Sequence, residues 1–347
     1  MKINWKTSDF DYNLPHELIA QSPLADRSTS RMMWIHKKSQ KYEDKHFYDI
    51  VDILKPGDVL VRNNTRVIPA RLFGIKEETG AHVELLLLKQ KEHDVWECLA
   101  GNAKVVKVGS IVSFGDGQLK AQCLSIGDKG IREMKMLYEG IFTEILDQLG
   151  QVPLPPYIKK KLDDSERYQT VYAKIDGSAA APTAGLHFTK EVDQQLLAKG
   201  ITITEVTLHV GLGTFRPMDV ENVHDHVMHS EVYEMSQETA DILNQAKKSG
   251  RRIVAIGTTS VRTLESVWNR FGQFQECRGE TTLFIYPGYQ WHTCDVMLTN
   301  FHLPKSTLLM MISSFMGYEL TQEVYHHAVN EKYRFFSFGD CMLIDHD

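Results

Sequence analysis

The spacing of apolar and polar residues marks one block of the chain as rich in strands. Between residues 70 and 138, apolar runs of strand length are separated by turn residues, without a helical pattern between them: 83–88, 95–99, 111–114, 119–124 and 131–138. Short strands joined by glycine-containing turns are typical of a small antiparallel barrel or sandwich. Asp116-Gly117 predicts a two-residue hairpin turn within this block, because glycine tolerates the positive φ of a type I′ turn.

The rest of the chain alternates between helical and strand patterns. Helices are predicted after about residue 141, at 190–199, from Ser236 to Gly250 and from Ser306 to Gly317, where Ser and Gly are good caps. Strands are predicted at 59–61, 201–210, 252–256 and 295–298. This alternation favours a largely parallel sheet with helices on both faces.

We therefore predict an α/β fold with two domains. A large α/β sheet domain would comprise residues 1–69 and 153–347, and a small all-β barrel domain, residues 70–152, would be inserted into it. The stiff segment Pro153-Leu154-Pro155-Pro156 marks the return to the first domain. A length of 347 residues agrees with about two domains.

Composition excludes several protein classes. The chain is 42% hydrophobic and 24% charged, which is typical of a globular protein and excludes a disordered one. Its longest apolar runs, Leu85–Leu88 and Leu308–Ile312, are too short to cross a membrane. The first residues lack the apolar stretch of a secretion signal, and five scattered cysteines suit a reducing compartment, so we expect a cytoplasmic protein. A net charge of −6 means that a nucleic-acid partner would need a local basic patch, such as residues 159–161.

Four junctions rich in Gly, Thr, Asn and His suggest a binding site. They lie at 181–188, 209–215, 257–262 and 298–304, where strands are expected to lead into helices. Ligands of open α/β sheets bind at such strand ends, and glycine lets the backbone approach a ligand closely. Taken singly, each junction could equally be only a turn with a helix cap. The candidate substrate-binding residues here are Thr183, Gly185, His209, Gly211, Gly213, Thr214, Thr258, Thr259, Ser260, Asn300 and Phe301.

Familiar cofactor and metal motifs are missing from the sequence. Arg216 stands where the third glycine of a dinucleotide fingerprint would be, and neither a P-loop nor G-x-S-x-G occurs. His224, His226 and His229 precede Glu231, but without H-E-x-x-H or a nearby cysteine we expect hydrogen-bonding histidines and no metal.

The motifs taken in order resemble one family, the S-adenosylmethionine:tRNA ribosyltransferase-isomerases of queuosine biosynthesis. The resemblance extends over nearly the whole chain, and Ala180 and Trp291 are small departures outside its polar positions. The matching segments are 8–12, 18–21, Arg27, 30–31, 63–71, 166–173, 181–189, 207–215, 226–231, 257–265, 283–289, 298–309 and 333–340.

The resemblance implies a reaction and its partners. The ribosyl group of S-adenosylmethionine would be transferred and isomerised onto 7-aminomethyl-7-deazaguanine at the wobble position of a tRNA. Epoxyqueuosine-tRNA would form, and adenine and methionine would be released. No cofactor beyond S-adenosylmethionine as co-substrate is implied. The partners would be that precursor tRNA and S-adenosylmethionine, with no membrane, and we expect a monomer.

The chemistry of that reaction assigns roles to the motif residues. The sulfonium acidifies the neighbouring 5′ protons, so a positioned base can start the reaction. We expect His187 or His229 to be this base, and Arg262, with the amides after Thr258, to hold an anionic group. Asn300 and His302 would orient the ribose or the incoming base, and Glu231 or Asp340 would bind the aminomethyl amine. Further substrate contacts are expected from Asn63, Asn64, Thr65, Arg66 and Tyr286.

These roles require the separated motifs to meet. We expect His187, His209, Thr259 and Asn300 to line one pocket. Two alternatives remain open at this point: an S-adenosylmethionine-dependent RNA methyltransferase, and a non-catalytic RNA-binding protein built on the barrel. The first lacks the usual acidic glycine-rich loop, and the second would not need polar loops along the α/β sheet.

Overall fold

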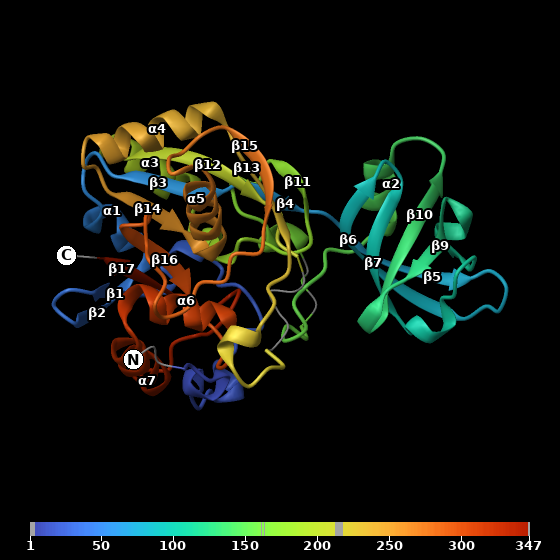
Figure 1. The fold of residues 1–347 in the computed structure, drawn as a ribbon, viewed down its shortest axis with the longest axis horizontal. Coiled ribbons are helices and arrows are strands. Elements are labelled where there is room, and N and C mark those ends of the chain that lie inside the picture. Colours follow the sequence, from blue (N-terminus) through green and yellow to red (C-terminus); the bar gives the residue numbers. More distant parts are fainter. Residues whose placement is uncertain (1–3, 161, 163, 212–217, 346–347) are drawn as a thin grey trace. The chain divides into compact units, whose positions relative to one another are not determined.

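The structure, a computed structural model, describes residues 4–160, 162, 164–211 and 218–345. Its contacts divide the chain into two compact units (Figure 1). The first, which we call the sheet unit, contains the described residues up to Thr65, those of 156–175 and those from Pro182 onward. The second, the barrel unit, contains residues 66–155 and 176–181, whereas the sequence placed the inserted domain at 70–152.

A mixed sheet of nine strands forms the centre of the sheet unit within the described residues (Figure 1). The four central strands, β12, β3, β14 and β16, run parallel to one another. On both sides of them the sheet also contains antiparallel strand pairs. The prediction of a largely parallel sheet is therefore correct only for its centre. In spatial order the strands are β15 (Cys277–Thr281), β13 (Glu231–Met235), β12 (Thr202–Leu208), β3 (Val59–Asn63), β14 (Ile253–Ile256), β16 (Val296–Asn300), β17 (Cys341–Asp345), β1 (Arg31–His36) and β2 (Lys41–His46).

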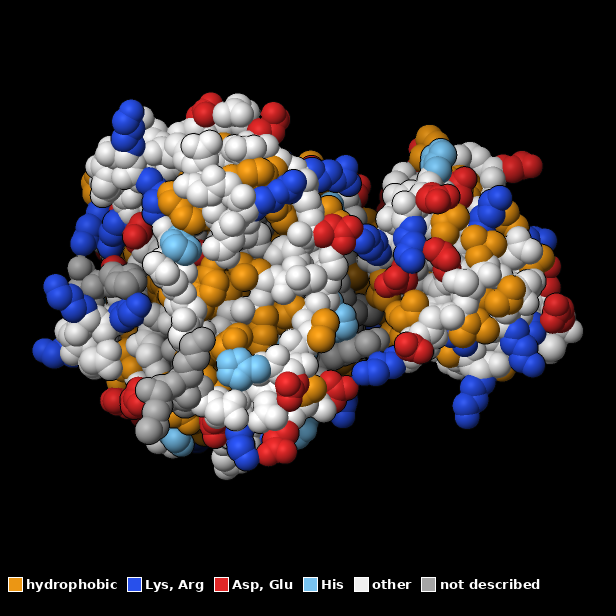
Figure 2. Space-filling view, in the orientation of Figure 1, with side chains coloured by type: hydrophobic (Ala, Val, Ile, Leu, Met, Phe, Trp, Pro, Cys, Tyr) orange, Lys and Arg blue, Asp and Glu red, His pale blue; other side chains and the backbone are white. Residues whose placement is uncertain are grey.

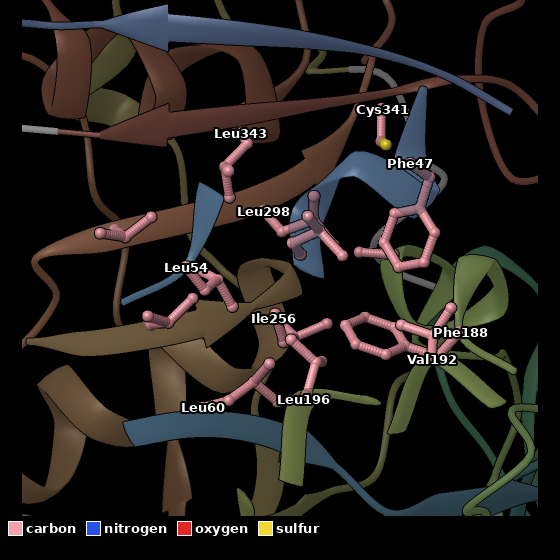
Figure 3. Packing of buried hydrophobic residues seen from close by; sticks show 14 of the residues in the cluster. Phe47, Leu54, Leu60, Phe188, Val192, Leu196, Ile256, Leu298, Cys341 and Leu343 are labelled. Carbon is pink, nitrogen blue, oxygen red and sulfur yellow. The ribbon is translucent and has the colours of Figure 1, made fainter. Parts of the chain in front are cut away.

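Helices cover both faces of this sheet, as the sequence predicts. On one face, α1 (Ile50–Ile53) and α3 (Lys190–Ala198) pack on apolar side chains of the central strands, with Phe188 and Leu298 in the same cluster (Figure 3). The other face carries α4 (Gln237–Lys248) and α5 (Gly257–Phe271), while α6 (Thr307–Met316) and α7 (Tyr318–Asn330) pack against each other. Strands β3, β14 and β16 are buried at every position, which explains the apolar runs at 59–61, 253–256 and 296–298.

The barrel unit is a closed antiparallel barrel, which confirms the prediction for the strand-rich block. Its burial pattern alternates along β5 and β8, as expected where one face of each strand points into the barrel. The loop at Asp116 spans residues 115–118, so the expected two-residue turn is wrong; Gly115, Asp116 and Gly117 all have positive φ. The elements are β5 (Arg71–Lys76), β6 (His82–Glu92), β7 (Val95–Gly101), β8 (Ile111–Phe114), β9 (Leu119–Ile126), β10 (Ile131–Tyr138) and α2 (Phe142–Leu149), and β4 (Thr65–Val67) pairs separately with β11 (Ile175–Ser178).

The sheet topology brings several candidate segments to one edge. Because β12, β3, β14 and β16 are parallel neighbours, their carboxyl ends lie at the same edge of the sheet. The residue directly after each of these strands is, in the same order, His209, Asn64, Gly257 and Phe301. Among the described residues, no helix is both long enough and apolar enough to cross a bilayer.

Candidate active site

His187 lies in a chain of hydrogen bonds at the end of β16. It belongs to a short 3-10 helix, η9 (Thr183–His187), which packs against β16. Its Nδ1 is 2.7 Å from Ser30 Oγ, and its Nε2 is 3.2 Å from Asn300 Nδ2. Asn300 Oδ1 accepts a hydrogen bond of 3.1 Å from Thr183 Oγ1. The structure therefore joins His187, Asn300 and Thr183, as the sequence predicted, and adds Ser30.

These contacts define the tautomer of His187. Asn300 Nδ2 also faces the carbonyl oxygen of Phe336 at 3.2 Å, so this atom must be the amide donor. His187 Nε2 then accepts, and Nδ1 carries the proton and donates it to Ser30 Oγ. Burial, and then the charges of Arg27 and Arg334, lower the pKa of His187 to about 3. His187 is thus a neutral imidazole with both ring nitrogens engaged.

A second cluster surrounds the start of α5. Arg262 and Glu231 are both buried and form an ion pair between Nη1 and Oε2. Glu231 Oε1 also accepts a 2.9 Å hydrogen bond from the backbone N–H of Gly211. Because Glu231 neutralises Arg262, this guanidinium is poorly suited to hold a second anion, which was its expected role.

A cavity of about 30 Å³ lies beside this ion pair. Its lining includes Thr258 and Thr259 from the first turn of α5 and the exposed side chain of His229. Thr259 Oγ1 is buried without a hydrogen-bond partner in the described part of the chain. Helix α5 also begins without a side-chain cap. A buried hydroxyl without a partner among the described residues, together with the first amides of a helix that has no side-chain cap, is suited to bind oxygen atoms of a ligand.

The residues at the end of β3 and directly after it contact neighbouring strands. Asn63 is fully buried, and its side chain bonds the backbone N–H and carbonyl of Leu208 at 3.0 and 2.9 Å. Thr65 Oγ1 is 2.8 Å from His209 Nδ1. Asn64 accepts from Thr207 Oγ1 at 2.7 Å. The contacts of Asn63 and Asn64 are those of side chains that position the strand ends.

Several other candidates are located in the protein interior. His302 is buried, its Nε2 is 2.8 Å from Thr299 Oγ1, and burial lowers its pKa to about 3. Phe301 is also fully buried, among the rings of an aromatic cluster. Asp340 accepts backbone N–H groups of Arg31 and Arg334 at 2.9 and 2.7 Å, and burial raises its pKa.

The remaining candidates have local partners or fall outside the description. Ser260 Oγ donates to the carbonyl of Ile256 at 2.7 Å, and a Cβ on Gly185 would collide with Tyr172. Tyr286 Oη lies 3.0 Å from His224 Nδ1. Within the described residues, no group of three or more His, Cys, Asp or Glu side chains could hold a metal ion. Arg66 is 4.0 Å from Asp176 within the barrel unit. Gly213 and Thr214 lie outside the described residues.

The basic segment expected to meet nucleic acid is only partly described. Lys159 and Lys160 are exposed, and Lys161 lies outside the described residues. The ring of nearby Tyr157 packs against Phe336, with centroids 4.4 Å apart, so it is occupied within the protein. On the face shown in Figure 2, cationic and anionic side chains are interspersed over both units.

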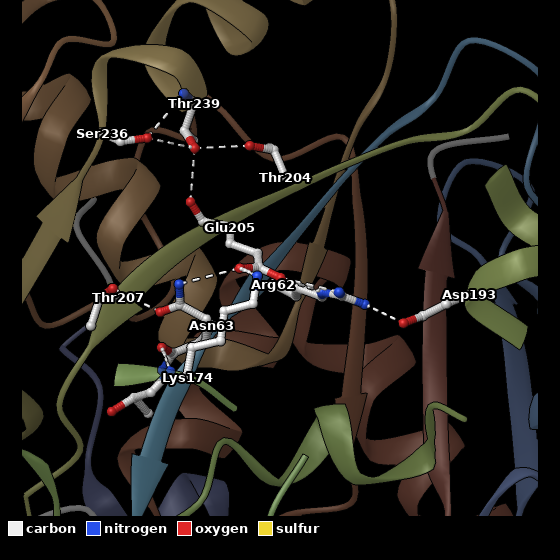
Figure 4. A network of polar contacts seen from close by, with 11 residues as sticks. Arg62, Asn63, Lys174, Asp193, Thr204, Glu205, Thr207, Ser236 and Thr239 are labelled. Atoms are coloured by element: carbon white, nitrogen blue, oxygen red, sulfur yellow. Dashed lines mark hydrogen bonds and ion pairs between the residues drawn. The ribbon is translucent and has the colours of Figure 1, made fainter. Parts of the chain in front are cut away.

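His187 and Thr259, expected in one pocket, line two separate cavities in the described structure, and neither cavity is lined by His209 or Asn300. Thr259 lines the cavity beside α5, whereas His187 lines a smaller one of about 20 Å³ together with Ser30 and Ser337. A third, of about 820 Å³, opens where β13 diverges from β12. Several of its charged groups form ion pairs with each other, as Arg62 does with Asp193 and Glu205 (Figure 4), and its size alone does not make it a site.

Sequence reasoning missed the arginines around His187. Arg27 and Arg167 line the same cavity, and the charge of Arg334 also reaches His187. The available signal was that each lies in one of the matching segments, at Arg27, 166–173 and 333–340. No spacing within the sequence could show that these three segments meet.

Two comparisons with known proteins identify relatives of this chain. The sequence matches the family described as queuosine biosynthesis protein over residues 7–344. It is also similar to the crystal structure of an S-adenosylmethionine tRNA ribosyltransferase from Thermotoga maritima, with 38% sequence identity and a TM-score of 0.57. That similarity covers 97% of this chain and 100% of the other. The family match includes every segment that contributes to the two cavities beside α5 and His187.

Proposed function

Because the chain belongs to the queuosine biosynthesis protein family, we propose that it transfers and isomerises the ribosyl group of S-adenosylmethionine onto a tRNA. The acceptor is 7-aminomethyl-7-deazaguanine at the wobble position, and the products are epoxyqueuosine-tRNA, adenine and methionine. The observation that carries the proposal is the similarity, over nearly the whole chain, to an S-adenosylmethionine tRNA ribosyltransferase.

His229 is the better of the two candidate bases. The reaction begins when a base removes a 5′ proton that the adjacent sulfonium has acidified. His229 is exposed and lines the cavity beside Thr259, so a substrate bound there can reach its ring nitrogens. His187, in contrast, is buried with both nitrogens in hydrogen bonds, and its pKa of about 3 makes it a weak proton acceptor. We assign His187 to positioning Asn300.

The polar groups beside the small cavity at α5 are suited to hydroxyl groups of the ribose. Thr259 Oγ1 has no hydrogen-bond partner among the described residues, and α5 has no side-chain cap. The hydroxyl and the first amides of this helix can therefore form hydrogen bonds with the hydroxyl oxygens of the sugar. The Glu231–Arg262 pair forms one wall of this cavity, and its charges cancel there. The sulfonium itself supplies the activation of the 5′ carbon, so the proposed reaction uses no cofactor beyond this co-substrate. We further propose that the enzyme is a cytoplasmic monomer.

Isotope labelling tests the reaction. The protein is incubated with precursor tRNA and S-adenosylmethionine labelled either in the ribose or in the methyl group. We expect ribose label in the RNA, together with one adenine released for each label incorporated, and no methyl label. Methyl label in the RNA would instead identify a methyltransferase, and absence of both labels and of adenine would leave an RNA-binding protein.

Single-turnover kinetics test the base. His229→Ala is expected to slow adenine release by roughly 100-fold or more, the usual contribution of general base catalysis. The control is His326→Ala, since His326 is an exposed histidine on α7, away from this cavity. A wild-type rate for His229→Ala would refute the assignment.

A further inference from the structure

Three arginines from distant segments gather around the cavity that His187 lines. Arg27 and Arg167 form part of its wall, and Arg334 is close enough for its charge to act on His187. All three are half-buried. They hold the segment 22–27 in place: Arg334 donates to the carbonyl of Ser22, and Arg167 donates to those of Leu24 and Ala25. These contacts make the cluster part of the fold.

Within the described residues, no direct ion pair neutralises the positive charge of this cluster. In the described part of the chain, the hydrogen-bond partners of the three guanidiniums are backbone carbonyls, including that of Gln169 at 3.0 Å from Arg27. Arg167 Nε and Arg334 Nη1 are buried without any partner there. The nearby carboxylates of Asp164 and Asp340 accept backbone N–H groups instead.

The cluster carries an electrostatic cost that an anion would relieve. Burial, and then the charge of Arg167, lower the pKa of Arg27, and burial lowers the pKa of Arg334. Like charges brought together in a half-buried place repel one another, and this arrangement is stable when an anion binds between them. Guanidinium groups with unused N–H donors are the usual partners of carboxylates and phosphates.

We propose that Arg27, Arg167 and Arg334 bind the carboxylate of the methionine part of S-adenosylmethionine. This inference rests on the proposed function, which requires a cationic partner for that carboxylate. Arg262, the other candidate, is already paired with Glu231. The cavity of about 20 Å³ has room for roughly one or two waters, which suits the two oxygens of a carboxylate and not a nucleotide. Ser30 and Ser337 offer hydroxyl groups in the same cavity.

Binding of S-adenosylmethionine and of its decarboxylated analogue tests the proposal. Equilibrium dialysis is carried out with the full-length protein and an anticodon stem-loop that carries guanosine at the wobble position, so that no transfer can occur. We expect Arg27→Gln, Arg167→Gln and Arg334→Gln each to weaken S-adenosylmethionine roughly 10- to 100-fold, as for a lost hydrogen bond to a charged group. Affinity for the decarboxylated analogue is expected to stay the same, because it has no carboxylate to lose.

Two further variants control for folding and for total charge. Arg27→Lys keeps the charge and is expected to recover part of the S-adenosylmethionine affinity. Arg278→Gln removes a positive charge from an exposed position in the sheet unit and is expected to change neither affinity. The unchanged binding of the decarboxylated analogue shows in the same experiment that each variant is folded.

Other results overturn the proposal. Equal weakening of both ligands would mean that the arginines only maintain the fold. Unchanged S-adenosylmethionine affinity, with weaker stem-loop binding and a smaller dependence on salt, would mean that the anion is an RNA phosphate. Because this assay measures binding without turnover, its outcome is independent of the labelling experiment. A protein that binds the carboxylate but transfers no ribose would refute the proposed function alone.

Discussion

At the scale of the residue, two buried histidines illustrate how the fold sets the chemistry of a side chain. His187 and His302 are neutral because burial disfavours the protonated form of both, and their pKa falls from 6.5 to about 3. In the unfolded chain they would regain the higher value. Below about pH 6.5 the unfolded state therefore binds protons that the folded state does not bind, and stability falls as the pH decreases.

Removal of one buried imidazole tests this linkage. Between about pH 6 and pH 5, the unfolding free energy of the wild type decreases as the pH falls. We expect His302→Gln to make this slope smaller by about 1 kcal/mol per pH unit. Urea denaturation over a series of pH values measures it, and His326→Gln, at an exposed position, is the control that leaves the slope unchanged. A slope that is the same in His302→Gln and wild type would contradict the burial argument.

At the scale of the element, the start of α5 depends on one glycine. Gly257 has a φ of +79°, and a Cβ at this position would come within 3.3 Å of the Cβ of Ala184 in η9. Glycine thus allows both the left-handed backbone and the close approach of α5 to the turn that carries His187. This contact joins α5, which lines one cavity, to η9, which lines the other.

Gly257→Ala is expected to affect stability and activity together. The left-handed backbone costs an alanine about 1–2 kcal/mol, and displacement of the first turn of α5 is expected to lower the rate of ribosyl transfer by about tenfold or more. The matched control is Gly250→Ala, which has a φ of +67° but no neighbouring atom within 4 Å. It is expected to lose similar stability and to keep the wild-type rate. Denaturation and single-turnover assays measure the two effects, and equal rates in both variants would argue against the contact.

At the scale of the whole molecule, each unit has its own core. Leu85 is fully buried in the barrel unit, and Leu298 is fully buried in the sheet unit. Separate cores make it possible for one unit to lose stability while the other keeps it.

Hydrogen exchange resolves the two units. Leu85→Ala is expected to destabilise the barrel unit by about 2–5 kcal/mol and to speed exchange in its strands, with no change in β3, β14 and β16. Leu298→Ala is expected to have the converse effect. Faster exchange throughout the chain in either variant would show that the units unfold as one.

Local patterns were sufficient to predict many of the elements. Residues 111–114 and 131–138 were predicted as strands with the bounds that β8 and β10 have, and Ser236 and Ser306 cap α4 and α6 as expected. These features depend on periodicity and on hydrogen bonds between near neighbours, which the sequence expresses directly. The two-residue turn at Asp116 was wrong because several successive positive φ angles gave a longer loop.

Long-range pairing was beyond such patterns. Strand β17 comes from the end of the chain and inserts between β16 and β1, which makes that side of the sheet mixed. The same holds for the candidate residues: local motifs could identify them, but only the fold could show their partners. The motifs identified His187 and Arg262 as candidates, but only the fold showed that Glu231 neutralises Arg262 and that Ser30 and Asn300 occupy the nitrogens of His187.

The sequence by itself determined the α/β class, the inserted barrel and the family resemblance, because these depend on periodic burial and on ordered motifs. The tertiary structure alone decided which charges are paired and which are free to meet a ligand. Arg27, Arg167 and Arg334 lie far apart in the chain, and their charges come together only where folding brings their segments around one cavity. Electrostatic interaction depends on distance in space and on burial, and neither is encoded in the separation of residues along the chain.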